Sequence, residues 1–250
     1  MSQQPIVLIT GGGRGIGAAT ARLFAQNGYH VAVNYLSNHQ AANALVEELR
    51  KMGANAIAIQ ADVAVESQVA RLFDKVIEQF GVPTVLVNNA GVLHQQSRMD
   101  QISAERFQQV LLANTMSCFL CAKQAVLKMS TRYGGRGGAI INVSSGAALS
   151  GSPNEYVDYA ASKGAMDTLT RGLALEVAQE GIRVNGVRPG LIYTEMHASG
   201  GEPERVERLQ HKIPLGRGGE AHEVAQAIFW LASENASFVT GKFIDTTGGL

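Results

Sequence analysis

The 250-residue chain is short of cysteine, tryptophan and net charge. It contains two cysteines and one tryptophan, and its 21 basic and 21 acidic residues give a formal net charge of zero at pH 7. Without a positive excess or a basic block, the sequence gives no reason to expect nucleic acid or a membrane as a partner. Met1–Pro5 lacks the charged start and apolar core of a signal peptide, and no apolar run approaches the roughly 18 residues of a membrane span. We therefore expect a cytoplasmic location.

The two cysteines, Cys118 and Cys121, have the Cys-x-x-Cys spacing of some redox and metal sites. A second pair of ligands does not accompany them, and they lie in an apolar stretch of helical character. Free cysteine packs as a small hydrophobic residue. We expect both side chains in the core and no metal site.

Acidic residues are missing from the first 46 positions, although Arg14 and Arg22 are present there. The first carboxylate is Glu47. A surface that is free of carboxylates suits a highly anionic ligand, because no like charge repels it.

Hydrophobic residues make up 46% of the chain and charged residues 17%, which is ample material for one domain over residues 1–250. Apolar segments alternate with segments of helical periodicity, a pattern that indicates parallel strands joined by right-handed crossovers. The expected fold is α/β, a doubly wound parallel sheet (Rossmann fold) of about seven strands. The expected strands are Ile6–Ile9, His30–Tyr35, Ala56–Ala61, Thr84–Val87, Ala139–Val143, Ile182–Val187 and Lys242–Asp245. The expected helices are Ala18–Ala25, Ala41–Met52, Glu66–Phe80, Ala104–Arg132, Asn154–Glu180 and Ala221–Ala232, with residues 195–219 irregular apart from one short helix.

Five glycines lie between positions 11 and 17, directly after the first expected strand. A glycine-rich turn that leads into a helix presents free N–H groups and the positive end of the helix dipole to a diphosphate. The spacing Gly11, Gly15, Gly17 differs from the common Gly-x-Gly-x-x-Gly fingerprint. A tight turn without a ligand is therefore the alternative.

Polar or glycine-rich residues follow five of the expected strands. In a parallel sheet these positions meet at the carboxyl edge, where ligands of doubly wound folds bind. They are Gly11–Gly17, Asp62, Asn88–Gly91, Ser144–Ser145 and Pro189–Gly190. Their agreement favours a nucleotide site over a bare turn.

Tyr159 and Lys163 are four residues apart in an expected helix, so their side chains share one face. A phenol titrates near ~10, which makes it a poor acid–base catalyst at neutral pH. An adjacent cation favours the phenolate and lowers that pKa. The alternative is an exposed tyrosine over a lysine, which is common on helix surfaces.

With the glycine turn, these residues resemble the short-chain dehydrogenase/reductase family, from Thr10 to Gly249. Thr10-Gly-x-x-x-Gly15-x-Gly17 is similar to the family's cofactor turn, which explains its spacing, and Asn88–Gly91 is similar to the motif after the fourth strand. Asn114, Ser145, Tyr159 and Lys163 occupy the family's catalytic positions. Pro189–Thr194 is similar to the segment that faces the nicotinamide.

The resemblance implies hydride transfer between a nicotinamide cofactor and a secondary alcohol or carbonyl substrate. In the implied mechanism Tyr159 exchanges the hydroxyl proton, and Ser145 hydrogen-bonds the substrate oxygen. Lys163 lowers the tyrosine pKa and holds the nicotinamide ribose, while Asn114 anchors a proton-relaying water. The implied cofactor-binding residues are Gly11, Gly13, Arg14, Gly15, Ile16, Gly17, Asp62, Val63, Asn89, Ala90, Gly91, Tyr159, Lys163, Pro189, Gly190, Ile192 and Thr194.

Two of these assignments have a neighbouring competitor. Ser144 competes with Ser145, but alignment with the family's strand favours Ser145, and the loop to Tyr159 must then bulge by one residue. Tyr156 competes with Tyr159, but the residue four positions beyond Tyr156 is an alanine.

The expected cofactor is NADP(H), with NAD(H) possible as the alternative. NAD-binding relatives usually carry an acid at the end of the second strand, and residues 34–38 contain none. Arg14 lies in the glycine turn, where it can meet a 2′-phosphate; alternatively it is solvated and selectivity is loose.

The resemblance leaves the substrate open between sugars and oxoacyl carriers. His94, Gln95, Gln96 and Glu155 suggest a polar pocket and hence a hydroxylated substrate, or are solvated loop residues. Residues 195–219 are the expected substrate lid. A homotetramer, or a dimer, is implied by resemblance. The alternative function is a nucleotide-sensing protein without turnover. A methyltransferase also has a glycine-rich turn after its first strand, but that function would leave the Tyr159–Lys163 pair unexplained.

Overall fold

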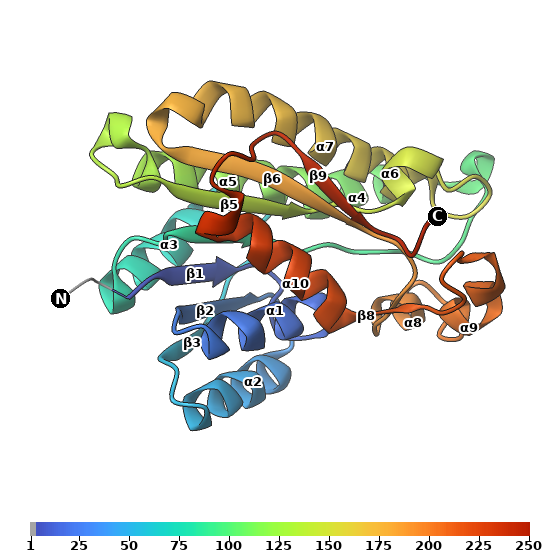
Figure 1. Ribbon diagram of the computed structural model, residues 1–250. Helices are drawn as coiled ribbons and strands as arrows, with labels where there is room; N and C mark the ends of the chain where they lie inside the picture. The colour runs from blue at the N-terminus through green and yellow to red at the C-terminus, as the bar shows by residue number, and fades with distance from the viewer. Residues whose placement is uncertain (1–3) are drawn as a thin grey trace.

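The computed structural model describes residues 4–250. Part of the N-terminal stretch discussed above, residues 1–3, lies outside the described residues. Seven parallel strands form the central sheet in the order β3-β2-β1-β4-β5-β6-β9, with helices on both faces (Figure 1). This confirms the expected doubly wound sheet.

The first half of the chain supplies four strands and three helices. The strands are β1 (Ile6–Ile9), β2 (His30–Tyr35), β3 (Ala56–Gln60) and β4 (Val85–Asn88). The helices are α1 (Gly15–Gln26), α2 (His39–Lys51) and α3 (Glu66–Phe80). All seven bounds lie within a few residues of the sequence-based expectations.

The second half adds the strands β5 (Gly138–Val143), β6 (Ile182–Pro189) and β9 (Phe243–Thr246) to this sheet. Its helices are α4 (Ala104–Leu111), α5 (Ser117–Met129), α6 (Ala147–Ser150), α7 (Val157–Val177), α8 (Met196–Ser199), α9 (Arg205–Leu209) and α10 (Ala221–Ala232). Short strands β7 (Ile192–Tyr193) and β8 (Gly219–Glu220) pair with each other in a separate small sheet.

Each face of the sheet has its own apolar core. On one face α1, α2 and α10 cover side chains such as Ile9 and Val33, and Phe24 of α1 packs edge-on against Phe229 of α10. On the other face α3, α5 and α7 cover Leu8 and Ile140. Strands that are buried on both faces read as continuous apolar runs, which is why their positions are visible in the sequence.

The expected helix over residues 104–132 is interrupted. A π-helical turn, Leu112–Met116, joins α4 to α5, and its Asn114 is fully buried. Such turns insert one extra residue into a helix and are frequent at functional sites. The expected helical region is therefore present as far as Met129, but the π turn within it was not foreseen.

Among the described residues, one helix has the length and composition of a membrane span. It is Ala104–Met129, counted through the π turn, with 26 residues, and its most apolar 18-residue window has a mean hydropathy of 1.5. Of its most apolar window 44% is buried in the protein, where Cys121 and Met129 pack in the sheet core. A core helix has this composition because it covers a sheet.

Residues 195–219 contain more regular structure than expected. Two short helices, α8 and α9, are followed by a 3₁₀ turn at Gln210–Lys212. The pairing of β7 with β8 joins the two ends of this segment. In Figure 1 the segment stands beyond the carboxyl end of the sheet, and we call it the 195–219 segment.

Candidate functional site

The glycine turn after β1 is packed so closely that side chains are excluded. A Cβ added to Gly17 would lie 2.6 Å from Asn89 Nδ2 and 2.7 Å from the Gly11 carbonyl oxygen. Gly11 has φ +59°, and a Cβ there would lie 2.9 Å from Ala90 Cα. The turn is therefore a bare-backbone cradle at the N-terminus of α1, which fits a diphosphate.

The motif after β4 fastens this turn from the other side. The Thr10 hydroxyl oxygen accepts hydrogen bonds from the N–H groups of Asn89 and Ala90, both at 3.0 Å. The Asn89 side chain donates to the carbonyl oxygens of Thr10 and Gly11, also at 3.0 Å. Asn89 therefore holds the turn in place. A side chain at Gly17 would collide with Asn89, and one at Gly11 would collide with Ala90.

Asn34, at the end of β2, also supports the turn. It is buried, its Oδ1 accepts from the Gly11 N–H at 3.3 Å, and its Nδ2 donates to the Ala61 carbonyl oxygen at 3.0 Å. A neutral amide thus stands near the position where NAD-binding relatives place a carboxylate. Arg14 in the glycine turn and Leu36, which follows β2, are both exposed.

Asp62 and Val63 follow β3 at the same edge. The Asp62 carboxylate caps its own loop by accepting from the Ala64 N–H at 2.9 Å, and its N–H donates to Gln68 at 2.9 Å. Val63 is buried. The loop is therefore ordered by local bonds, beside the end of β2.

Ser145, Tyr159 and Lys163 lie together at the carboxyl end of β5. Tyr159 and Lys163 share a face of α7, with Lys163 Nζ 5.6 Å from the centre of the tyrosine ring. The Ser145 side chain lies close enough to the Tyr159 hydroxyl to affect the pKa of Tyr159, and Lys163 donates to the Val143 carbonyl oxygen at 2.8 Å. Lys163 is buried and Tyr159 is half-buried, so the pair is not an exposed surface contact.

Asn114 ties the π turn to this cluster. Its Oδ1 accepts from the Val92 N–H at 2.7 Å, and its Nδ2 donates to Ser162 at 3.0 Å, one residue from Lys163. A Cβ on Gly91 would lie 3.2 Å from Asn114 Oδ1 and 3.5 Å from Lys163 Nζ. The glycine turn's supporting motif and the catalytic cluster therefore adjoin at Gly91.

Burial governs the protonation of the cluster in the chain alone. It raises the pKa of Tyr159 to about 12, partly offset by the Ser145 hydrogen bond, and lowers the pKa of Lys163 to about 8. This differs from the expectation that Lys163 lowers the tyrosine pKa. The reason is that loss of water around the phenol disfavours the phenolate. A further positive charge is needed to bring Tyr159 into the neutral range.

The structure separates both pairs of competitors. Ser144 is buried and donates to Asp167 at 2.6 Å, whereas Ser145 is half-buried and lowers the pKa of Tyr159. Tyr156 is buried with Arg205 over its ring, away from a lysine of α7. In the loop between Ser145 and Tyr159, Ser152 and Asn154 adopt positive φ, as a loop with an extra residue would.

The segment after β6 reaches back to the glycine turn. A Cβ on Gly15 would lie 3.3 Å from Thr194 Cγ2 and 3.6 Å from Glu195 Oε2. Ile192 is buried in the small sheet, and Gly190 packs against Thr247, whose Cα would be 2.8 Å from an added Cβ. Pro189–Thr194 thus closes one side of the space between the turn and Tyr159.

An ionic cluster ties the 195–219 segment to the loops around the site. Arg205 is buried and pairs with Glu155 and with Glu202, the latter at 2.9 Å. Gln96 also donates to Glu202 at 2.5 Å. Glu155 and Gln96 are therefore bonded to this segment; Glu155 is half-buried, whereas Gln96 is also exposed to solvent.

The cysteines lie where the sequence analysis expected them. Cys118 and Cys121 are buried and not disulfide-bonded. Burial raises the pKa of Cys118 to about 12, so it stays a neutral thiol. Among residues 4–250, no group of three His, Cys, Asp or Glu side chains is placed to hold a metal ion.

Comparison with known proteins decides the family. A family model described as Enoyl-(Acyl carrier protein) reductase matches residues 11–250. The uncharacterized oxidoreductase YgfF of Escherichia coli (strain K12) is 57% identical over 244 residues, which cover 98% of this chain and 99% of YgfF. The chain belongs to the short-chain dehydrogenase/reductase family.

This short-chain dehydrogenase/reductase is similar to other named proteins along its whole length. The 3-oxoacyl-(acyl-carrier-protein) reductase FabG of Staphylococcus aureus (strain Mu50) is 37% identical over 250 residues, 100% of this chain and 99% of FabG. A crystal structure of a dehydrogenase/reductase from Sinorhizobium meliloti 1021 superposes with a TM-score of 0.88 at 32% identity, covering 98% of this chain and 94% of that one. The family predicted from the motifs is confirmed.

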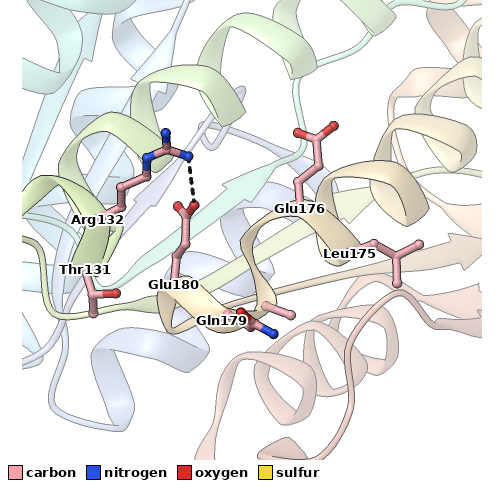
Figure 2. A pocket seen from close by; sticks show the side chains of 7 residues that line it. Thr131, Arg132, Leu175, Glu176, Gln179 and Glu180 are labelled. Atoms are coloured by element: carbon pink, nitrogen blue, oxygen red, sulfur yellow. Dashed lines mark ion pairs between the residues drawn. The ribbon is translucent and has the colours of Figure 1, made fainter.

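A surface depression elsewhere on the short-chain dehydrogenase/reductase is separate from this site. It has a volume of about 800 Å³ and is lined by Arg132, Leu175 and Glu180 among others (Figure 2). These residues directly precede β5 and β6, so the depression lies at the amino edge of the sheet, opposite the glycine turn and Tyr159.

Sequence reasoning missed the residues that support the catalytic cluster. Asp167 and Arg188 form a buried ion pair at 2.8 Å behind Ser144. Arg106 pairs with the buried Asp158 at 2.7 Å, next to Tyr159. A charged residue on the apolar side of a helix is a signal of such a pair, because charges are almost never fully buried unless paired.

Proposed function

We propose that the protein is an NADP(H)-dependent oxidoreductase that transfers hydride between the cofactor and a secondary alcohol or carbonyl substrate. The observation that carries the proposal is the adjacency, at Gly91, of the bare-backbone cradle to the Ser145–Tyr159–Lys163 cluster, in which the lysine is buried. A nucleotide-sensing protein has no need for a tyrosine over a buried lysine beside its cradle. When bound, the cofactor supplies the hydride chemistry.

The chain's own residues bind the cofactor and manage the proton. Gly11, Gly13, Gly15, Ile16 and Gly17 present the α1 N-terminus to the diphosphate. Asp62 and Val63 border the adenine, and Asn89, Ala90 and Gly91 border the riboses. Pro189, Gly190, Ile192 and Thr194 border the nicotinamide.

In the reduction direction, Tyr159 gives its hydroxyl proton to the substrate oxygen while Ser145 donates a hydrogen bond to the same oxygen. Lys163 holds the nicotinamide ribose and stabilises the phenolate that results. Asn114 anchors a water that returns a proton to the cluster. General acid–base catalysis of this kind contributes roughly 10²–10⁴-fold in rate.

NADP(H) is favoured over NAD(H) by charge. Asn34, a neutral residue at the end of β2, uses its side-chain amide to hydrogen-bond the turn and Ala61. Arg14 is exposed, so its charge can meet a 2′-phosphate. No acidic residue precedes Glu47 in the sequence. We propose the 195–219 segment as the substrate lid and the cytoplasm as the location.

The substrate is proposed to be a 3-oxoacyl thioester or a sugar-like alcohol. The FabG name of one relative supports the first class. The ionic cluster around Arg205 supports the second, because it places carboxylates and an amide on the 195–219 segment and on the loops that the segment contacts.

A homotetramer, or a dimer, is proposed as the assembly. The α4–α5 region exposes four large apolar side chains, each 38–48% accessible: Phe107, Leu112, Met116 and Phe119. A group of exposed apolar side chains is typical of a protein–protein contact surface. Light scattering with Phe119→Glu, which places a charge on that face, tests this proposal: the variant is expected to give a smaller species than the wild type.

The test of the function is a paired assay. Fluorescence titration with NADPH and NADH measures binding, and loss of NADPH absorbance with 3-oxoacyl thioesters, sugars and simple ketones or alcohols measures turnover. Tyr159→Phe is expected to bind cofactor like the wild type and to lose 10²–10⁴-fold in kcat. Tyr156→Phe, the matched control, is expected to keep kcat within about threefold because Tyr156 has no lysine partner.

Near-wild-type turnover by Tyr159→Phe on a proven substrate contradicts the mechanism. Tight cofactor binding with no turnover of any substrate class supports the nucleotide-sensing alternative instead.

A further inference from the structure

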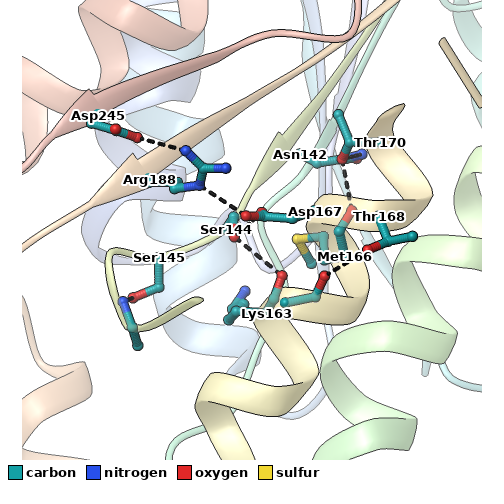
Figure 3. Close-up of polar contacts among 12 residues, drawn as sticks. Asn142, Ser144, Ser145, Lys163, Met166, Asp167, Thr168, Thr170, Arg188 and Asp245 are labelled. Carbon is teal, nitrogen blue, oxygen red and sulfur yellow. Dashed lines mark hydrogen bonds and ion pairs between the residues drawn. The ribbon is translucent and has the colours of Figure 1, made fainter. Parts of the chain in front are cut away.

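A buried carboxylate lies one helical turn beyond Lys163. Asp167, on α7, is only 4% exposed. Each of its two carboxylate oxygens accepts a hydrogen bond. Oδ1 accepts from the Ser144 hydroxyl at 2.6 Å, and Oδ2 accepts from Arg188 Nε at 2.8 Å (Figure 3). Neither partner belongs to α7: Ser144 follows β5, and Arg188 lies on β6.

Arg188 is held on its other side as well. Its Nη1 donates to Asp245 on β9 at 3.1 Å, and its guanidinium lies 4.0 Å from the centre of the Phe243 ring. Arg188 is 7% exposed, so the ion pair with Asp167 is shielded from water. A buried pair of this kind costs desolvation and is no general source of stability, which makes a specific role worth seeking.

The contacts of Asp167 lead to both parts of the catalytic cluster. Ser144 precedes Ser145, and the Ser144 hydroxyl also lies 3.4 Å from the Lys163 carbonyl oxygen. Lys163 Nζ donates to Val143, the last residue of β5. Asp167 therefore fastens the end of β5 to α7 at the point where Ser145 and Lys163 meet.

Asp167 also affects the charge state of Lys163. Cys118 on α5 and Tyr159 on α7 face the ammonium as neutral groups, because burial raises the pKa of each to about 12. Asp167 supplies a negative charge from α7, and Arg188 on β6 partly neutralises it. Desolvation lowers the pKa of Lys163, and Cys118 and then Asp167 oppose that shift; of these two, Asp167 is the one held in an ion pair as a carboxylate.

We propose that Asp167 is a positioning residue of the reaction: its carboxylate, shared between Ser144 and Arg188, aligns the end of β5 with α7 and places a negative charge one helical turn from Lys163. The inference rests on the proposed function, since it acts through Ser145 and Lys163. Arg188 is the counter-charge that limits how strongly Asp167 acts on the lysine.

The first experiment is a titration of Lys163 that needs no substrate. In protein labelled with ¹³C at lysine Cε, with the signal assigned by Lys163→Arg, the wild-type signal is expected to titrate at about pH 8. In Asp167→Asn it is expected to titrate about one unit lower, because a negative charge is lost. In Arg188→Met it is expected to move the opposite way, because the counter-charge is lost.

The second experiment is the pH dependence of kcat in the reduction direction. Lys163 is cationic below its pKa, so its loss of a proton contributes to the fall in activity at alkaline pH. That fall is expected to begin about one unit lower in Asp167→Asn. Asp245→Asn is the matched control: it removes the other carboxylate on Arg188, which is half-exposed and does not contact Ser144, and it is expected to shift the fall by less than about 0.3 unit.

A merely structural carboxylate predicts lower kcat with an unmoved lysine titration. That result, or shifts of the same sign in Asp167→Asn and Arg188→Met, overturns the inference. If Asp167→Asn does not fold, Asp167→Glu with Arg188→Met decides it: Glu keeps the wild-type titration, and Met raises it.

The two proposals fail in different ways. Absence of turnover with every substrate rejects the proposed function, while the lysine titration still measures the coupling. Turnover that depends on Tyr159, with a lysine titration unmoved by Asp167→Asn, rejects the positioning role alone.

Discussion

The two halves of the site are built in different ways. The half around β1, α1 and β4 is made of backbone: glycines exclude side chains, and Thr10, Asn34 and Asn89 hold the chain by its N–H and carbonyl groups. The half around β5, β6 and α7 is made of buried polar side chains that bond one another. The first half suits a ligand that is gripped by main-chain groups, and the second suits proton transfer.

The difference predicts different kinds of damage. In the backbone half a substitution changes shape, so cofactor binding is lost first. In the side-chain half a substitution leaves a buried polar or charged partner without its bond, so stability and proton transfer are lost.

The largest effect is expected in the side-chain half, from Asp158→Ala. Asp158 is 1% exposed, pairs with Arg106 at 2.7 Å and accepts from the Tyr159 N–H at 2.9 Å. Its removal leaves Arg106 without its partner, and the free energy of unfolding in urea is expected to fall by about 3 kcal/mol.

The control for this variant is Asp100→Ala, which breaks the exposed pair with Arg98. It is expected to change the free energy of unfolding by less than about 1 kcal/mol, because water screens that pair. Equal losses in the two variants would remove the contrast between the buried and the exposed pair.

The next effect is expected in the backbone half, from Gly17→Ala. The added methyl meets Asn89 and the Gly11 carbonyl oxygen at less than 3 Å, so the turn must shift. The Kd for NADPH is expected to rise about 100-fold, equivalent to about 2.7 kcal/mol. Gly172→Ala, on α7 with open space around it, is expected to leave the Kd unchanged and to stabilise the helix by about 0.5–1 kcal/mol. Unchanged NADPH affinity in Gly17→Ala would mean that the turn is no cradle.

The smallest effect is expected at the edge of the backbone half, from Arg14→Ala. Arg14 is exposed, and loss of its charge is expected to raise the Kd for NADPH about tenfold, or about 1.4 kcal/mol, while NADH changes by less than about twofold. Arg22→Ala is the control, because Arg22 forms an ion pair with Glu48 at 2.7 Å and its charge is therefore already neutralised. A parallel loss for both cofactors would contradict recognition of the 2′-phosphate.

The same contrast explains what the sequence made predictable. The glycine turn and Asn88–Gly91 are local patterns set by backbone geometry, and the strands are apolar runs between them, so both could be placed to within a few residues. Tyr159 and Lys163 have a four-residue spacing, and they were singled out because this spacing together with the other motifs resembles the short-chain dehydrogenase/reductase family. Each of these signals lies within a short stretch of chain.

The parts that escaped prediction depend on partners far along the chain. The π turn at Asn114 is stabilised by bonds to Val92, 22 residues away, and its residues are ordinary helix formers. Asp167 meets Ser144 and Arg188 across gaps of 23 and 21 residues. The helix α9 carries Arg205, whose partner Glu155 lies 50 residues back, so an irregular segment was expected.

In the chain alone the pKa of Tyr159 differs from the expectation. A neighbouring lysine predicted a lowered pKa, whereas burial raises the pKa to about 12. We propose that the positive charge of the oxidised nicotinamide ring, beside the hydroxyl in the proposed complex, lowers it.

The most direct measurement is the ultraviolet titration of that one phenol, taken as wild type minus Tyr159→Phe. Without cofactor the tyrosinate signal is expected near pH 12. With saturating NADP⁺ its midpoint is expected to fall by at least about two units, and with uncharged-ring NADPH by much less. A midpoint that is the same with and without NADP⁺ would contradict the claim that the redox ring lies beside Tyr159.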